Sequence, residues 1–256
     1  MNETRGSQPG DGSRLTDPHA LSVPQRVYMW LSTVLVTCLL VANVVGVKLF
    51  RVELDLGPLG LIPVEHTVGM LPFPMTFLLT DLLNEYFGKK AARRTTYIAF
   101  VMGGLAFAMY AVARKAPILE GIPGTATQGA FENVFGAATL MYLASLGAFL
   151  FGSLLDIFLF GVFKRFTGGR YVWFRATGST VISQLFDSFL VTFFFFYVAQ
   201  VLTGGESASF GFIFRTALTG YVLKFVIAVA MTPLIYLGRW MLSRWFGLVP
   251  IPASGA

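Results

Sequence analysis

Long apolar runs separated by short polar segments dominate the sequence. A helix that crosses the ~30 Å hydrocarbon layer of a membrane needs ~20 mostly apolar residues, and six stretches of the chain meet that requirement. The pattern therefore predicts an all-α membrane protein, built as a bundle of six transmembrane helices. The predicted spans cover residues 27–50, 68–87, 95–114, 135–163, 176–202 and 212–240.

The region around the second span is less regular than the rest. Pro72 and Pro74 fall at its start, where proline removes backbone donors, so we expect a short or broken helix. Before it, residues 51–56 and 60–64 alternate partly between polar and apolar and flank a Gly-Pro pair at 57–58. This arrangement indicates a short hairpin at the membrane surface, between the first and second helices.

The chain divides into two parts by composition. Residues 1–26 are rich in Gly, Ser, Asp and Pro, and we interpret them as a disordered cytoplasmic tail. Residues 27–250 carry the apolar runs and form the predicted six-helix transmembrane domain. The tail lacks an apolar stretch of signal-peptide length, so we expect the first span to act as the membrane-insertion signal.

Composition agrees with a membrane environment and argues against nucleic acid. Of the 256 residues, 55% are hydrophobic and 12% are charged, whereas about a quarter of the residues in soluble domains are charged. The formal net charge of +6 does not indicate nucleic-acid binding, because the basic residues lie in short connections and not beside aromatic residues on one surface. The expected partners are the lipid bilayer and a small solute, and a homo-oligomer is left open.

The basic residues are distributed unequally between alternate connections. One set of connections holds only Arg51, Arg114, Lys115 and Arg215. The other set is far richer, and the positive-inside rule therefore places both termini in the cytoplasm. Its basic residues are Arg5, Arg14, Arg26, Lys89, Lys90, Arg93, Arg94, Lys164, Arg165, Arg170, Arg175, Arg239 and Arg244.

Charged and amide side chains inside the apolar runs are the candidate functional residues. A carboxylate at mid-membrane costs ~2.5–3.5 kcal/mol on insertion scales, so each one needs a partner or a water-filled cavity. Asp81 and Glu85 lie four residues apart, and Gln184 and Asp187 lie three apart, so each pair shares one helix face. The candidate substrate-binding residues are Asn43, Lys48, Asp81, Asn84, Glu85, Arg175, Gln184, Asp187 and Lys224.

A structural role for the same residues is the alternative. Lys48 could pair with Glu85, and Lys224 with Asp187, simply to hold helices together, although an average intramembrane hydrogen bond contributes only ~0.6 kcal/mol. Asp156, near the end of its span, fits a structural and a functional role equally well. The flat aromatic side chains that could stack on a ligand are Phe77, Trp173, Phe189 and Phe193.

Catalytic chemistry is not indicated by the sequence. The two histidines, His19 and His66, fall outside the predicted spans, so neither can activate an intramembrane nucleophile. The clustered His and Cys residues of a zinc site are absent, as is the Gly-rich phosphate loop of an ATPase. We expect neither an enzyme nor a metal or cofactor site.

Several spaced motifs run through the predicted spans. They are Asn43-x4-Lys48, Phe73-Pro74-x6-Asp81-x2-Asn84-Glu85-x2-Gly88, Arg93-Arg94, Trp173-x-Arg175, Ser183-Gln184-x2-Asp187, Tyr221-x2-Lys224 and Thr232-Pro233-x2-Tyr236. These motifs resemble those of the queuosine precursor transporter family, formerly grouped with vitamin uptake transporters. The resemblance covers residues 27–240 and has one departure, Ser188, where the family pattern leads us to expect threonine after Asp187.

The resemblance implies a multi-pass protein of the bacterial inner membrane that imports 7-cyano-7-deazaguanine, and its aminomethyl relative, for tRNA modification. It also implies a fold similar to the substrate-binding subunits of energy-coupling-factor importers. A deazaguanine presents adjacent N1–H and amine donors that one carboxylate can accept together. Asp81, Glu85 and Asp187 are the candidate acceptors, and the sequence leaves the choice among them open.

Two other functions remain open at this point. The chain could be the binding subunit of a vitamin importer that works beside a separate ATP-driven module, since Ala42 and Gly46 place small residues on one face of the first helix. It could also be a membrane assembly factor whose polar residues only fasten helices together.

Overall fold

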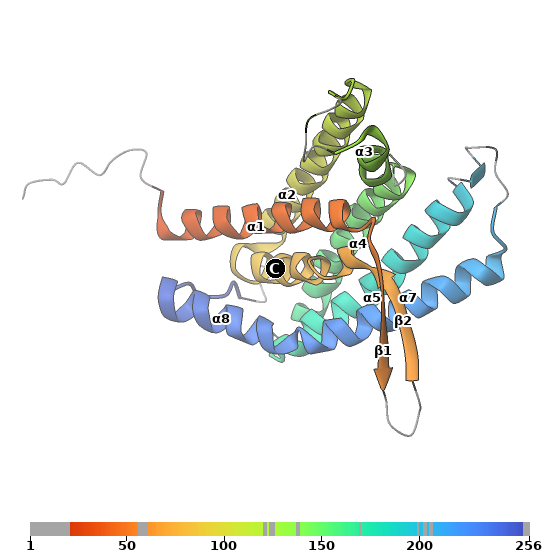
Figure 1. The fold of residues 1–256 in the computed structure, drawn as a ribbon. Coiled ribbons are helices and arrows are strands. Elements are labelled where there is room, and N and C mark those ends of the chain that lie inside the picture. The colour runs from red at the N-terminus through yellow and green to blue at the C-terminus, as the bar shows by residue number, and fades with distance from the viewer. Residues whose placement is uncertain are drawn as a thin grey trace, which may run out of the picture.

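The apolar runs form helices, and two paired strands precede the second of these helical regions (Figure 1). The computed structural model describes residues 21–55, 61–119, 122, 126–136, 139–168, 170–198, 200–201, 204 and 207–252. Residues 1–20 of the expected tail lie outside this range. The elements are α1 (Val23–Val45), β1 (Leu49–Asp55), β2 (Leu61–Thr67), the 3₁₀ turn η2 (Val68–Met70), α2 (Phe73–Lys115), α3 (Gln128–Phe135), α4 (Thr139–Phe166), α5 (Val172–Phe193), the π-helical turn η3 (Phe194–Val198), α7 (Phe210–Ala230) and α8 (Thr232–Phe246).

The first helix begins and ends earlier than the sequence pattern predicts. Ser22 caps α1: its side chain accepts from the Gln25 N–H at 3.4 Å, and the Gln25 side chain accepts from the Ser22 N–H at 2.9 Å. This capping box is a start signal, and Pro24 fits the first turn because that turn needs no backbone donor. The expected tail boundary after residue 26 therefore falls inside the helix.

The hairpin prediction is confirmed. Strands β1 and β2 pair antiparallel, with Leu49 opposite Thr67 and Asp55 opposite Leu61. The turn that joins them, residues 56–60, lies outside the described residues. Because β1 begins at Leu49, the first helix cannot extend to residue 50 as expected.

Five helical stretches among the described residues are long and apolar enough to cross a membrane, so the chain is an all-α, multi-pass membrane protein. The count differs from six because the second and third predicted spans are joined in α2, which has 43 residues. At a rise of 1.5 Å per residue this helix measures ~65 Å, more than twice the hydrocarbon thickness. The connection expected between these two spans is therefore reduced to a break within one helix.

That break lies at Gly88, whose backbone has φ 82° and ψ 169°, a conformation available mainly to glycine. The carbonyl of Glu85 loses its partner within the helix there and accepts a hydrogen bond from the Ile251 N–H at 2.9 Å. The segment that follows α8 thus supplies a hydrogen-bond donor at the break. The two arms of α2 run in different directions on either side of it (Figure 1).

The last predicted span, in contrast, is divided between two helices. Instead of one helix over 212–240, α7 ends at Ala230 and α8 starts at Thr232, with Pro233 in the first turn of α8. Proline cannot donate to the preceding turn, which ends one helix and starts the next. The start predicted at 135 for the fourth span is wrong as well: α3 ends there, held to α2 by an Arg114–Glu132 ion pair of 2.7 Å.

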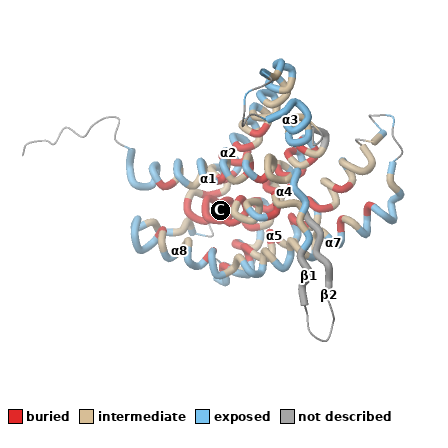
Figure 2. Tube along the Cα trace, viewed as in Figure 1, coloured by how far each residue is buried: buried red, intermediate tan, exposed pale blue. Residues whose placement is uncertain are grey.

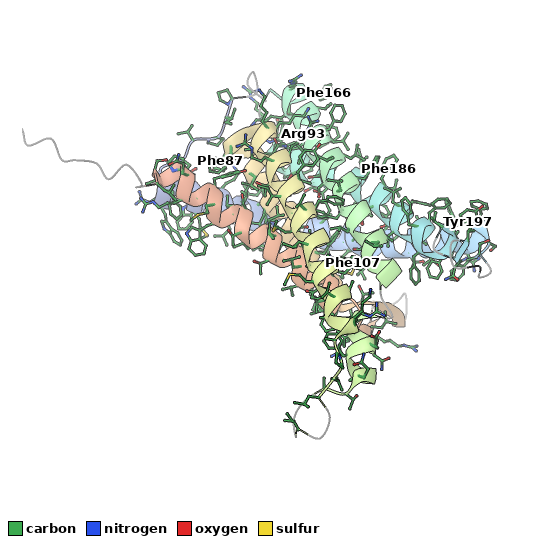
Figure 3. All side chains as sticks on the ribbon, turned by 90° about the horizontal axis from the view of Figure 1, so that it is seen from above. Phe87, Arg93, Phe107, Phe166, Phe186 and Tyr197 are labelled. Carbon is green, nitrogen blue, oxygen red and sulfur yellow. The ribbon has the colours of Figure 1, made fainter. Side chains whose placement is uncertain are left out.

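The core lies where α1, α2, α4 and α5 meet, and buried residues concentrate there (Figure 2). Leu35 of α1, Leu83 of α2 and Phe149 of α4 are fully buried in one cluster. The outer faces carry large apolar side chains: Phe166 is 85% exposed and Phe186 is 49% exposed, and both lie at the edge of the bundle (Figure 3). Such a surface suits lipid.

One end of the bundle gathers the start of α1, the break in α2 and the C-terminal part of α8. The Tyr28 hydroxyl donates to the Ala91 carbonyl at 3.4 Å, and the Tyr86 hydroxyl donates to the Arg239 carbonyl at 3.1 Å. The hairpin follows the other end of α1 (Figure 1). The charge pattern assigns these three regions to the same side of the membrane. In the structure they lie at the same end of the bundle.

Candidate functional site

A cavity of about 180 Å³ lies among α1, η2, the first arm of α2, α4, α5, α7 and α8. Its wall is mostly apolar and carries a small number of polar groups from facing helices, which is typical of sites for small molecules. Five of the predicted site residues line it, namely Asn43, Asp81, Gln184, Asp187 and Lys224.

Asp81 and Gln184 line the cavity with side-chain polar atoms that have no hydrogen-bond partner among the described residues. They come from α2 and α5, and their exposed fractions are 2% and 3%. Within the described residues, neither carboxylate oxygen of Asp81 and neither side-chain polar atom of Gln184 makes a hydrogen bond. A buried polar group without a partner costs ~1–3 kcal/mol, so these groups are suited to receiving a ligand.

Asp187 and Lys224 join α5 to α7 by an ion pair in the cavity wall. The Asp187 side chain is 1% exposed and the Lys224 side chain is 16% exposed. The ammonium also lies 5.6 Å from the centre of the Phe73 ring, within range of a cation–π contact. The second oxygen of Asp187 has no hydrogen-bond partner among the described residues, so the pair retains one acceptor that can receive a ligand.

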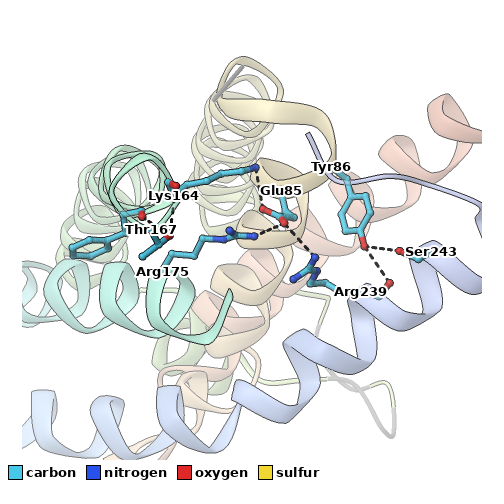
Figure 4. Close-up of polar contacts among 8 residues, drawn as sticks. Glu85, Tyr86, Lys164, Thr167, Arg175, Arg239 and Ser243 are labelled. Atoms are coloured by element: carbon cyan, nitrogen blue, oxygen red, sulfur yellow. Dashed lines mark hydrogen bonds and ion pairs between the residues drawn. The ribbon is translucent and has the colours of Figure 1, made fainter. Parts of the chain in front are cut away.

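Glu85 and Arg175 lie outside the cavity lining, in an ion cluster that we call the Glu85 cluster (Figure 4). Glu85 on α2 contacts Lys164 of α4 at 3.1 Å, Arg175 of α5, and Arg239 of α8 at 3.6 Å. The side chains of Lys164 and Arg175 are 2% and 1% exposed. Four elements are thus tied together one helical turn beyond Asp81, and the suggested pairing of Glu85 with Lys48 is wrong.

Asn84 and Lys48 also lie away from the cavity lining. The Asn84 amide donates to the Ile157 carbonyl at 3.2 Å, which joins α2 to α4 in the core. Lys48 is exposed in the segment between α1 and β1. Asn43 lines the cavity, but its amide donates to the Leu39 carbonyl at 3.0 Å.

Asp156 is the residue that the sequence-based site omits. Its side chain is fully buried on α4, and one oxygen accepts from Thr180 and from Ser183 of α5, each at 3.2 Å. It lies beside Asp81, close enough for the two carboxylates to interact directly. The one available sequence signal was the offset that Asp81–Lys89 shares with Asp156–Lys164.

Aromatic side chains border the cavity at the hairpin end of α2. Phe77 lines it, as the sequence suggests, together with Phe73, and the two ring centres are 5.3 Å apart. Trp173 is 49% exposed, and neither Phe189 nor Phe193 contributes to the wall described for this cavity.

Comparison with known proteins identifies the family. Residues 67–238 match the model of the family described as "Putative vitamin uptake transporter". The chain is 32% identical to a "Probable queuosine precursor transporter" of Bacillus subtilis (strain 168) over 183 residues, 70% of this chain and 73% of the relative.

A "Probable queuosine precursor transporter" of Haemophilus influenzae is 26% identical over 211 residues, 81% of this chain and 83% of the relative. No solved structure matches the chain. The match to the family model extends over most of the helical bundle, from η2 into α8. The chain therefore belongs to the queuosine precursor transporter family.

Proposed function

We propose that this protein imports a queuosine precursor, 7-cyano-7-deazaguanine in preference to its 7-aminomethyl relative, across the bacterial inner membrane. The names of its two relatives support the substrate class. The observation that carries the proposal is the presence of two buried side chains without hydrogen-bond partners, Asp81 of α2 and Gln184 of α5, in the lining of one cavity.

The chemistry of the base matches these groups. Its N1–H and exocyclic amine are adjacent donors, and a carboxylate with both oxygens available can accept from them as a bidentate pair. Asp81 has both oxygens available, whereas Asp187 shares one with Lys224. We therefore assign the donor edge of the base to Asp81 and the O6 acceptor to the Gln184 amide. Phe77 can cover the flat ring.

The preference for the nitrile over the aminomethyl form rests on Lys224. Its ammonium belongs to the cavity lining and is 16% exposed, so it can donate to a nitrile nitrogen. An aminomethyl group is a cation at neutral pH and would meet a like charge there. In a competition assay we expect 7-cyano-7-deazaguanine to bind more tightly, and replacing Lys224 with Met should reduce the difference.

For the topology, we propose that the two arms of α2 cross the membrane separately, which restores six crossings. The length of α2 and its break at Gly88 support this arrangement. The end that gathers Arg26, Lys89 and Lys164 would face the cytoplasm, with both termini on that side. Reporter fusions after α8 that are active only in the periplasm would contradict it.

Import also requires a barrier between the cavity and the cytoplasm. The cavity lining includes Thr67, Gly69 and Met70, beside the hairpin, and reaches Asp81. The Glu85 cluster lies beyond Asp81 on the proposed cytoplasmic side and links α2, α4, α5 and α8. We propose that these ion pairs close the inner exit and separate when the base is released.

The decisive experiment uses cells that cannot make the precursor and lack their own carrier. Supplied with a limiting external concentration of 7-cyano-7-deazaguanine, cells expressing this protein should regain queuosine in tRNA, and cells expressing Asp81→Asn should regain much less. Glu132→Gln, an exposed change in α3, serves as the matched control and should restore queuosine fully. Correct membrane insertion without any rescue would refute the substrate assignment.

A further inference from the structure

We propose that Asp81 and Asp156 form a proton-binding pair that takes up one proton when the base binds and thereby couples import to the proton gradient. The coupling rests on the proposed function, whereas the proton site itself does not. The two carboxylates face each other from α2 and α4, with exposed fractions of 2% and 0%. Asp81 lines the cavity, whereas Asp156 is not part of the lining described for it.

The surroundings of the pair hold too few donors for two negative charges. Thr180 and Ser183 donate to one oxygen of Asp156. The second oxygen of Asp156 and both oxygens of Asp81 have no hydrogen-bond partner within the described residues. Without the base, a shared proton is favoured on Asp81, because the two hydroxyls stabilise ionised Asp156. When the base donates to Asp81, the proton is favoured on Asp156 and donates to Asp81, whose remaining lone pairs accept from the base.

The neighbouring charges gather around Glu85. Glu85, on α2, adds a third negative charge nearby, and Arg175 of α5 is a cation that acts on Asp81. Arg175 is bound to Glu85, as are Lys164 of α4 and Arg239 of α8. Three cations therefore stand against three carboxylates in this region, but these ion pairs are made with Glu85.

Binding of a neutral base changes the relative stability of the singly and doubly ionised forms of the Asp81–Asp156 pair. Water in the unliganded cavity screens the repulsion between the two carboxylates only in part, because their side chains are 2% and 0% exposed. When the base displaces that water, the effective dielectric constant falls further and the repulsion grows. The doubly ionised state is then disfavoured, so Asp156 takes a proton from water on the hairpin side, forming one O–H bond. It returns that proton to water when the inner exit opens.

The proton site can be tested without any substrate. Infrared spectra of the full-length protein near pH 7 should contain a carbonyl band from a buried protonated carboxylic acid in at least part of the molecules. Replacing both members of the pair, Asp81→Asn with Asp156→Asn, should remove this band, whereas Glu132→Gln, in which the carboxylate that pairs with Arg114 is replaced, should retain it. A wild-type spectrum without such a band at any pH where the protein is folded would overturn the proton site.

The coupling is tested by calorimetric titration of wild-type protein with 7-cyano-7-deazaguanine in buffers of different ionisation enthalpy. Where the infrared band shows the free pair to be ionised, we expect uptake to approach one proton per base, with affinity falling by about tenfold per pH unit; where the free pair is already protonated, uptake should be smaller. In Asp156→Asn we expect binding without proton uptake. In vesicles, one pH unit, acid outside, should support up to about tenfold accumulation that a protonophore abolishes.

The outcomes distinguish the two proposals. Base binding by wild-type protein without proton uptake overturns the coupling and leaves the proposed function standing. Absence of base binding refutes the proposed function and the coupling, and the infrared band then decides the proton site alone. Because the wild-type measurements suffice for each decision, a poorly folding Asp156→Asn variant does not weaken the test.

Discussion

Asp81 of the cavity and Glu85 of the Glu85 cluster lie one helical turn apart on α2, yet their buried carboxylates have opposite surroundings. At Glu85, one carboxylate meets three cations from three other helices. At Asp81, a carboxylate equally removed from water has another carboxylate beside it and no hydrogen-bond donor among the described residues. The ion pairs of Glu85 join helices together, whereas the Asp81 oxygens remain available to accept hydrogen bonds from a ligand.

The largest loss of stability should come from removing the negative charge of Glu85. Glu85→Gln leaves Lys164 and Arg175, both almost fully buried, without a counter-charge, and loss of one partner from a buried ion pair costs about 3–5 kcal/mol. We expect a sharp fall in membrane yield and in the melting temperature of detergent-purified protein.

The control for this change is Glu132→Gln. Glu132 pairs with Arg114 where the two side chains are 36% and 31% exposed, and exposed pairs contribute about 0–1 kcal/mol. Equal melting temperatures for the Glu85 and Glu132 variants would show that the Glu85 cluster is not a structural fastening.

A smaller loss is expected at Asp187, which combines both arrangements by pairing Lys224 and facing the cavity. Asp187→Asn should lower stability by about 1–3 kcal/mol, because the Lys224 ammonium loses its charged partner. Adding Lys224→Met should restore the melting temperature. The affinity for 7-cyano-7-deazaguanine should stay reduced in the double variant, and full recovery of affinity would remove Asp187 from the site.

How far the sequence predicts this structure depends on the range of the interactions involved. The apolar runs and the Gly-Pro segment are local signals, and they predict the helices and the hairpin. Periodicity also places Asp81 and Glu85 on one face of a helix, as expected. It cannot predict which helix that face meets. The structural alternative therefore offers Lys48, which is exposed, as a partner for Glu85, and the predicted site omits Asp156.

The remaining errors concern where helices break. Both Gly88 and Pro233 were visible in the sequence, but each can end a helix, bend it or fit within a first turn. The choice depends on tertiary contacts. At the break in α2, the Ile251 N–H donates a hydrogen bond to the Glu85 carbonyl. Residues more than one hundred positions away therefore determine a boundary that local pattern cannot locate.

Asp81→Asn should affect binding and leave stability intact. The new amide places a donor against the donor edge of the base, so affinity should fall by about tenfold, or about 1.4 kcal/mol. The melting temperature should stay the same or rise, because repulsion from Asp156 and Glu85 is removed. Calorimetry and thermal unfolding on the same sample measure both, and reduced stability at unchanged affinity would reverse the assignment.

The smallest effect is expected at Lys48, which the sequence motif places with the substrate-binding residues. Its side chain is exposed and outside the cavity lining, and exposed charges contribute little to stability. Lys48→Met should therefore change the affinity for 7-cyano-7-deazaguanine by less than about twofold and leave the melting temperature unaltered. A loss of affinity comparable to that of Asp81→Asn would mean that the substrate-bound protein brings the end of α1 over the cavity, and Lys48 would then join Asp81 in the site.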